Sequence, residues 1–192
     1  MTIEGPETKA AQTVHPRFAQ ALEELGLVSL TADVRRFPEA TRTAQEAAAA
    51  VGCELSAIVK SLIFTAELPG ADTDNAGTDN AGTENAGTDV PVLVLMDGAS
   101  RVDVERVRAE LGAAKVRRAK AEFVRETTGF AIGGVPPFGH RTKTLVLADK
   151  GLLDHPVVWA AAGTPHAVFP MEPAALIAHA GGSLVDVREG AQ

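Results

Sequence analysis

Apolar residues along the chain recur with two different periods, and segments of one period alternate with segments of the other. Spacings of three and four residues predict helices over residues 15–26, 43–52, 103–111, 120–127 and 173–179. Alternating or continuous apolar runs predict strands over residues 33–37, 58–66, 91–96, 115–118, 144–148, 157–161, 166–169 and 183–187. Short strands mixed with short helices predict an α+β domain around a curved or closed sheet.

The helix predicted over residues 43–52 has the clearest ends. Thr43 and Glu46 have the spacing of a capping box, in which each side chain bonds the other residue's main-chain N–H group. Gly52 follows the last apolar position, where a left-handed residue ends many helices. Both ends are therefore set by local sequence.

A pentapeptide repeat separates the strands predicted over residues 58–66 and 91–96. Thr-Asp-Asn-Ala-Gly begins at Thr73 and recurs at Thr78 and, with a glutamate, at Thr83. Because the repeat has no apolar face to bury, we expect a flexible acidic loop over residues 70–90. This loop would interrupt a single domain spanning residues 15–188, with a disordered leader over 1–14 and a tail over 189–192.

Composition narrows the possible functions. The chain has 192 residues, 45% of them hydrophobic, which is enough for one full core. Apolar runs are too short to cross a bilayer and the first residues lack a signal-peptide core, so no membrane association and a cytoplasmic location are expected. One cysteine, Cys53, excludes an intrachain disulfide, and the five histidines lack metal-ligand spacing. We expect neither a metal nor a cofactor.

Charge is unevenly distributed along the chain. The net charge of −7 argues against non-specific binding to nucleic acids, yet residues 101–125 contain eight basic and four acidic side chains. This stretch is either a surface that meets RNA phosphates, with Arg117, Arg118 and Lys120 as the contact candidates, or an ordinary solvated helix surface.

The segment over residues 128–140 contains four glycines and two prolines. Glycine lets the backbone approach a ligand closely, and proline fixes φ. A rigid loop of this kind is suited to presenting main-chain N–H groups to an acyl or phosphate oxygen. The alternative interpretation is a tight connection between two strands.

Lys60 is the one charged residue inside the predicted strand 58–66. Alternation places it on the same face as Ile58, Leu62 and Phe64. Its side chain either extends to an edge of the sheet or projects the ammonium group into a cleft.

Four segments, in their order along the chain, resemble the YbaK/prolyl-tRNA-synthetase-associated domain family. They are Thr-Ala-Gln-Glu-Ala-Ala over 43–48, Ile-Val-Lys-Ser-Leu-Ile-Phe over 58–64, Gly-Phe-Ala-Ile-Gly-Gly-Val-Pro-Pro-Phe-Gly over 129–139, and Val-Trp-Ala-Ala-Ala-Gly over 158–163. Each segment alone is a weak signal, but the ordered set is specific. The resemblance covers about residues 33–187.

The resemblance implies hydrolysis of the ester that joins a wrong amino acid to a tRNA 3′ end. It implies a mixed, mostly antiparallel, barrel-like sheet flanked by short helices, with an aminoacyl-tRNA synthetase as a second partner besides the aminoacyl-tRNA 3′ end. By motif match Lys60 would be the functional lysine. The substrate-binding candidates are Gly133, Gly134, Val135, Pro136, Pro137, Gly139, His140, Gly163, Thr164 and His166.

An activated ester needs mainly positioning, charge stabilisation and a water molecule or ribose hydroxyl. We favour a cationic Lys60 that holds a phosphate or carbonyl oxygen, with N–H groups of the Gly133–Gly134 turn at the carbonyl. Small rigid walls such as Val135 and Pro136 suit a small amino acid resembling cysteine, alanine, serine or threonine. The resemblance implies tRNA for proline as the carrier.

The chain departs from the family pattern at two points. It has no tyrosine, and the apolar residues Ala167, Val168 and Phe169 stand where some members carry an acidic residue. Both changes bear on which amino acid is recognised. Two alternatives to a deacylase stay open: a non-catalytic module that binds an aminoacyl group, a nucleotide or a protein on the same scaffold, and a regulatory protein that keeps only the scaffold.

Overall fold

The computed structural model describes residues 14–69 and 89–190. The predicted leader and repeat loop therefore fall almost wholly outside the described residues, as does the end of the predicted tail. Two of their boundary positions are structured: Val14 is buried in the core, and β3 begins at Asp89.

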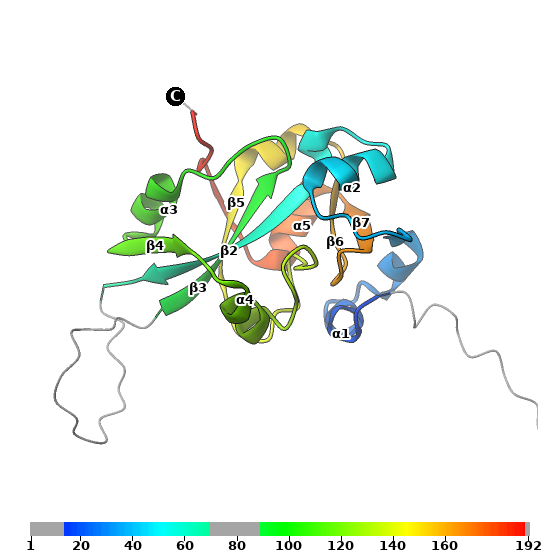
Figure 1. Ribbon diagram of the computed structural model, residues 1–192, viewed down its shortest axis with the longest axis horizontal. Helices are drawn as coiled ribbons and strands as arrows, with labels where there is room; N and C mark the ends of the chain where they lie inside the picture. The colour runs from blue at the N-terminus through cyan, green and yellow to red at the C-terminus, as the bar shows by residue number, and fades with distance from the viewer. Residues whose placement is uncertain (1–13, 70–88, 191–192) are drawn as a thin grey trace, which may run out of the picture.

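Helices and strands alternate along the chain as the apolar spacing predicts (Figure 1). The helices are α1 (Pro16–Glu24), α2 (Ala44–Val51), α3 (Val104–Leu111), α4 (Ala121–Thr128) and α5 (Pro173–Ala180), with short 3-10 helices at Val28–Asp33, Leu55–Ala57 and Lys150–Asp154. The strands are β1 (Arg35–Arg36), β2 (Val59–Glu67), β3 (Asp89–Asp97), β4 (Lys115–Arg118), β5 (Leu145–Asp149), β6 (Val158–Ala161), β7 (Ala167–Met171) and β8 (Ser183–Val185). The α+β class is confirmed.

The strands form two sheets. The larger sheet has the order β4-β2-β3-β5-β8, with antiparallel pairing on both sides of β2 and parallel pairing on both sides of β5. The smaller sheet, β1-β7-β6, is antiparallel. A single bridge between Ile58 and Trp159 connects the two sheets, and they do not close into a barrel. The mixed, mostly antiparallel pairing agrees with the expectation, and of the curved and closed alternatives the closed one does not occur.

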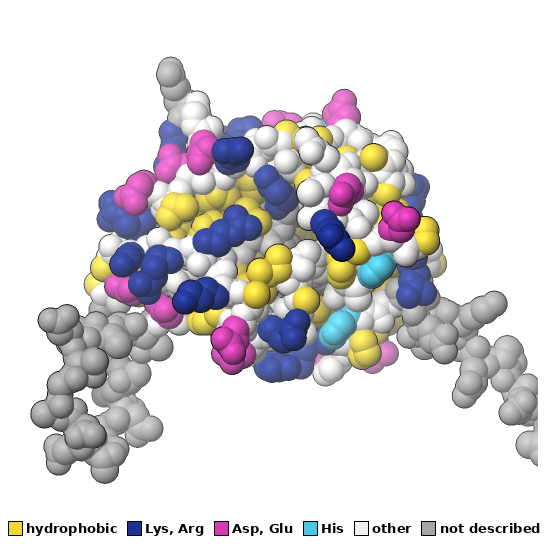
Figure 2. Space-filling model, viewed as in Figure 1, with side chains coloured by type: hydrophobic (Ala, Val, Ile, Leu, Met, Phe, Trp, Pro, Cys, Tyr) yellow, Lys and Arg dark blue, Asp and Glu magenta, His cyan; other side chains and the backbone are white. Residues whose placement is uncertain are grey.

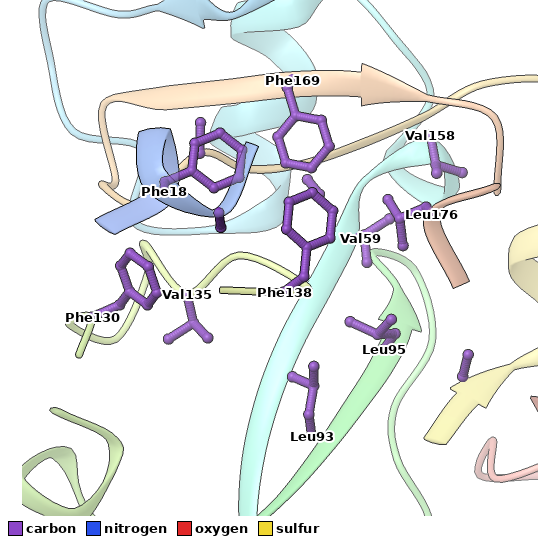
Figure 3. Close-up of a cluster of buried hydrophobic side chains, with 14 of the residues drawn as sticks. Phe18, Val59, Leu93, Leu95, Phe130, Val135, Phe138, Val158, Phe169 and Leu176 are labelled. Carbon is purple, nitrogen blue, oxygen red and sulfur yellow. The ribbon is translucent and has the colours of Figure 1, made fainter. Parts of the chain in front are cut away.

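Alternation along the central strands sends side chains to two separate cores. On one face of the large sheet, Val59 and Leu95 pack with Phe138 and Phe169. In Figure 3, Phe138 points from the glycine-rich segment toward Phe169. On the other face, Phe64, Val94 and Met96 pack with Val107 of α3, among others. The glycine-rich segment is thus anchored in the first core.

The ends of α2 are as predicted. The Thr43 hydroxyl accepts a hydrogen bond from the Glu46 N–H group at 3.1 Å, and the Glu46 carboxylate accepts one from the Thr43 N–H group at 3.1 Å. Gly52 ends the helix with φ of 80°, a left-handed conformation that glycine adopts without a Cβ clash. This cap fixes the start of α2 beside the site described next.

Candidate active site

The candidate site lies where one edge of β2 has no neighbouring strand. β4 pairs only with residues 64–67, and the Ile63 carbonyl accepts the last bond on that side from the Ala119 N–H group at 3.0 Å. Before that point, β6 touches this edge only through the bridge at Ile58. A cavity of about 310 Å³ occupies the opening.

Four parts of the chain surround this cavity, which we call the edge cavity. Its lining residues are Thr41, Arg42, Thr43, Ala44 and Ala47 at α2, residues 58–63 of the β2 edge, Arg118, Ala119 and Val124 at β4 and α4, Ile132, Gly133 and Val135 of the glycine-rich segment, and Trp159, Ala161 and Val168 of the small sheet. Figure 2 shows hydrophobic side chains gathered over the centre of this face, with Lys and Arg side chains around them.

The electrostatic character of the edge cavity is one-sided. The lining residues include three basic side chains, Arg42, Lys60 and Arg118, and no aspartate or glutamate. The Arg118 guanidinium carbon lies 6.0 Å from the centre of the Phe64 ring, so its charge is held over the β2 surface. A cavity with apolar walls and three cations favours a ligand that carries negative charge next to a small apolar group.

Lys60 is half-buried at this cavity, on the same face of β2 as Leu62 and Phe64, as alternation predicts. Its Nζ donates a hydrogen bond to the Ser100 carbonyl. The turn that presents this carbonyl is fixed by Asp97, whose Oδ1 accepts from the N–H groups of Ala99 and Ser100, each at 2.9 Å. An ammonium group has three donors, so two remain for a ligand.

Burial and nearby charges together shift the pKa of the Lys60 ammonium group. Desolvation is the largest influence and lowers this pKa. The Asp97 carboxylate raises it, whereas the Arg118 and Arg101 guanidinium groups lower it further. The basic neighbours that make the cavity attractive to an anion therefore also make the cation at Lys60 less stable without one.

The glycine-rich segment forms a tight bend at the cavity wall. The Gly134 N–H group donates to the Ala131 carbonyl at 3.0 Å, and Gly133 has φ of 90°. Gly134 packs so closely on the turn at 163–164 that an added Cβ would lie 2.7 Å from Thr164 Cα. The Gly134 N–H group is therefore engaged inside the bend, and the placement of N–H groups of the Gly133–Gly134 turn at a substrate carbonyl stays a prediction.

The predicted substrate-binding residues divide between the edge cavity and its supports. Gly133 and Val135 line the cavity, as does Lys60, whereas Gly134 and Pro136 are not among its lining residues. A second hollow, of about 360 Å³, is lined instead by Pro137, Gly139 and His140. The structure thus brings the lysine and the bend to one cavity and leaves the later part of the segment outside it.

His140 contacts the glycine-rich segment outside the edge cavity. Its Nε2 donates to the Pro136 carbonyl at 2.7 Å, and burial lowers the pKa of its ring, with the Pro136 bond opposing that shift. Gly163 packs against His15 and Phe130, and Thr164 packs against Gly134. These residues hold the bend in place and do not line the edge cavity.

His166 is the remaining member of the predicted substrate-binding set. Its main-chain carbonyl accepts a bond from the Phe37 N–H group at 2.8 Å, its side chain is exposed, and it does not line the edge cavity.

The three predicted RNA-contact residues occupy different surroundings. Arg118 lines the edge cavity. Its neighbour Arg117 points to the other face of β4, where its guanidinium contacts Glu67 at 2.9 Å and Asp89 at 3.0 Å. Lys120 is exposed and immediately precedes α4.

Several residues that line the edge cavity were not singled out from the sequence. Among them are Arg42, Ser61 and Trp159, which have polar or aromatic side chains. Ser61 and Trp159 lie inside segments that carry the family resemblance, and Arg42 directly precedes the capping box, but nothing in the local pattern distinguishes a cavity residue from a structural one. Their role depends on where β2 loses its neighbour, which is a property of strand pairing.

Within residues 14–69 and 89–190, no group of three or more His, Cys, Asp or Glu side chains could hold a metal ion. No helix in the same residues is long and apolar enough to cross a membrane.

The two sheets and the basic edge cavity define an α+β domain with a ligand-sized site, and comparison with known proteins supplies the family. The model of the aminoacyl-tRNA editing domain matches residues 38–178, so this chain belongs to the aminoacyl-tRNA editing domain family. A crystal structure of a candidate trans-editing enzyme for prolyl-tRNA synthetase is 40% identical, with a TM-score of 0.75 over 95% of this chain and 99% of that one.

Two proteins related by sequence complete the comparison. The uncharacterised protein YwhH of Bacillus subtilis (strain 168) is 29% identical over 141 residues, which are 73% of this chain and 76% of YwhH. The proline–tRNA ligase of Limosilactobacillus fermentum is 30% identical over 110 residues, 57% of this chain but only 16% of the ligase. The chain thus matches a small part of that synthetase.

Proposed function

We propose that this protein is an aminoacyl-tRNA deacylase that acts in trans on tRNA carrying a wrong, small amino acid, with tRNA for proline as the carrier. The observation that supports this most is the edge cavity, which has three basic and no acidic lining residues and lies between Lys60 of β2 and the bend at Gly133. The terminal nucleotide of tRNA brings a phosphate, and the ester brings a carbonyl oxygen; both suit such a cavity.

In the proposed reaction a water molecule attacks the ester carbonyl carbon, and the neighbouring ribose hydroxyl orients this water or relays its proton. The bond from that carbon to the ribose oxygen breaks, the oxygen takes the proton that the water loses, and a free tRNA end and a free amino acid result. Lys60 keeps its bond to the Ser100 carbonyl and donates its other N–H groups to a phosphate or carbonyl oxygen of the substrate. Arg42 and Arg118 hold the backbone phosphates.

The apolar part of the edge cavity supports a small side chain. Ala44, Ala47 and Ala161 leave room beside Val168 and Trp159, and the whole cavity is small for a ligand site. Each extra methylene changes binding by only about 1–3 kcal/mol, so such a site separates small from large side chains gradually. A synthetase partner would add selectivity for the tRNA.

A deacylation screen tests the proposal. Alanine, cysteine, serine and threonine are each charged onto tRNA for proline, and release of the amino acid is followed for wild type, Lys60→Ala and the control Lys150→Ala. Lys150 lies outside the edge cavity and contacts Asp186 at 2.8 Å. We expect wild type and Lys150→Ala to release one or more of these amino acids, and Lys60→Ala to be slower by at least a hundredfold while still folded.

Failure of wild type to release any amino acid would refute the deacylase. Binding of the same tRNAs without release would then identify a non-catalytic recognition module.

A further inference from the structure

The open edge of β2 offers more to a ligand than the Lys60 side chain. Main-chain groups of successive residues in a strand point to alternate edges. The carbonyls of Ile63 and Glu67 accept bonds on the β4 side, from the N–H groups of Ala119 and Ala114. Ser61, two residues before Ile63, therefore directs its own N–H and C=O groups to this side, where β4 no longer pairs.

The Ser61 side chain is a second observation at the same point. Its hydroxyl oxygen is shielded from solvent and has no hydrogen-bond partner among the described residues. Leaving a buried hydroxyl unpaired costs about 1–3 kcal/mol. Ser61 also lines the edge cavity. A buried hydroxyl without a partner, beside a main-chain carbonyl that lies beyond the last residue paired with β4, in a residue that lines a ligand-sized opening, is an arrangement that a hydrogen-bond donor would complete.

We propose that the Ser61 edge of β2 binds the free α-ammonium group of the aminoacyl ester, through the Ser61 carbonyl and hydroxyl oxygens. This rests on the proposed function and adds a statement of substrate class: the site accepts esters with a free amino group and rejects N-acylated esters, including peptidyl esters. An acylated nitrogen has lost its charge and all but one of its donors, and its acyl group would enter the wall of β2.

The two adjacent residues suit opposite charges on one substrate. Alternation places the Lys60 side chain on one face of β2 and the Ser61 side chain on the other, facing the bend that carries Val135. Lys60 is also held toward Ser100, away from that bend. A ligand lying across the strand edge can therefore set its oxygens against Lys60 and its ammonium group against Ser61 without bringing the two cations together.

Calorimetry with stable amide analogues tests the proposal without depending on catalysis. The ligands are 3′-alanylamino-3′-deoxyadenosine, its lactyl counterpart, which carries a hydroxyl in place of the ammonium group, and its N-acetylalanyl counterpart. The proteins are wild type, Ser61→Ala and Thr65→Val. Thr65 is the matched control, since it is buried on the same face of the same strand but does not line the edge cavity.

We expect wild type and Thr65→Val to bind the alanyl analogue at least tenfold more tightly than the lactyl one, and the N-acetyl analogue not at all. Ser61→Ala should bind the alanyl analogue about tenfold more weakly, as expected for a hydrogen bond to a charged group, and the lactyl analogue almost as wild type does. Its melting temperature should not fall, because the substitution removes an unpaired buried hydroxyl.

An alanyl-to-lactyl ratio that Ser61→Ala leaves unchanged would overturn the proposal, as would tight binding of the N-acetyl analogue or no binding of the alanyl analogue to wild type. The two proposals fail separately. An alanyl-to-lactyl affinity ratio that depends on Ser61, without any deacylation, would refute the deacylase proposal alone. Deacylation with a ratio that Ser61→Ala leaves unchanged would refute the ammonium site alone.

Discussion

Gly134 is the position where one added methyl group tests the role of the bend. Its backbone is not left-handed, so alanine meets no conformational penalty there. The new Cβ would lie 2.7 Å from Thr164 Cα and 2.9 Å from the Gly163 carbonyl oxygen. Both are backbone atoms and cannot rotate away, so the bend must move by several tenths of an ångström.

The expected loss of stability is that of an overpacked site, about 1–3 kcal/mol. For a domain of this size that lowers the melting temperature by roughly 2–12 °C. Gly133 and Val135, on either side, line the edge cavity and move with Gly134. Because displacements approaching 1 Å can reduce a rate about a hundredfold, we expect Gly134→Ala to lower kcat/KM at least tenfold.

Gly112→Ala is the matched control. Gly112 ends α3 with φ of 59° and has nothing within 4 Å of an added Cβ, so its cost of about 1–2 kcal/mol is conformational and remote from the cavity. Thermal unfolding and deacylation are measured at a temperature where all three proteins are folded. Wild-type activity in Gly134→Ala would refute the argument that the contact with residues 163–164 positions the bend.

Two further predictions concern charge. Arg118→Ala should reduce the slope of log affinity against log salt concentration, measured for the single-stranded tRNA end, by about 0.7, which corresponds to one phosphate contact. Arg117→Ala should leave this slope unchanged, because Arg117 is already paired with Glu67 and Asp89. Equal slopes for both variants would contradict this prediction. Burial lowers the pKa of His140 below 6.5, so the unfolded chain binds a proton first, and stability should fall as the pH drops through about 6.5. Urea unfolding at pH 7.5 and 5.5 should show a smaller loss in His140→Asn, with His15 contributing equally to both proteins; equal losses would exclude that role.

Local sequence predicted the elements well because their signals are local. The capping box at Thr43, the alternation around Lys60 and the glycines that end helices each involve residues a few positions apart. The face of β2 that carries Lys60 follows from the same alternation.

What the sequence did not reveal depends on contacts between distant segments. The parallel pairing of β3 with β5 joins residues some fifty positions apart, and the open edge at Ser61 exists only because β4 stops pairing at Phe64. The use of the Gly134 N–H group inside the bend and the placement of Arg42 and Lys60 at one cavity likewise follow from tertiary packing. None of these has a signature in composition or spacing.

Trp159 offers a direct test of where the aminoacyl group binds. It is the one tryptophan of the chain and it lines the edge cavity, so its indole N–H gives a single signal in a proton–nitrogen correlation spectrum. We predict that 3′-alanylamino-3′-deoxyadenosine shifts this signal saturably, over the same concentration range in which it inhibits deacylation. Inhibition by the analogue with an unmoved Trp159 signal would place the substrate elsewhere and contradict the account.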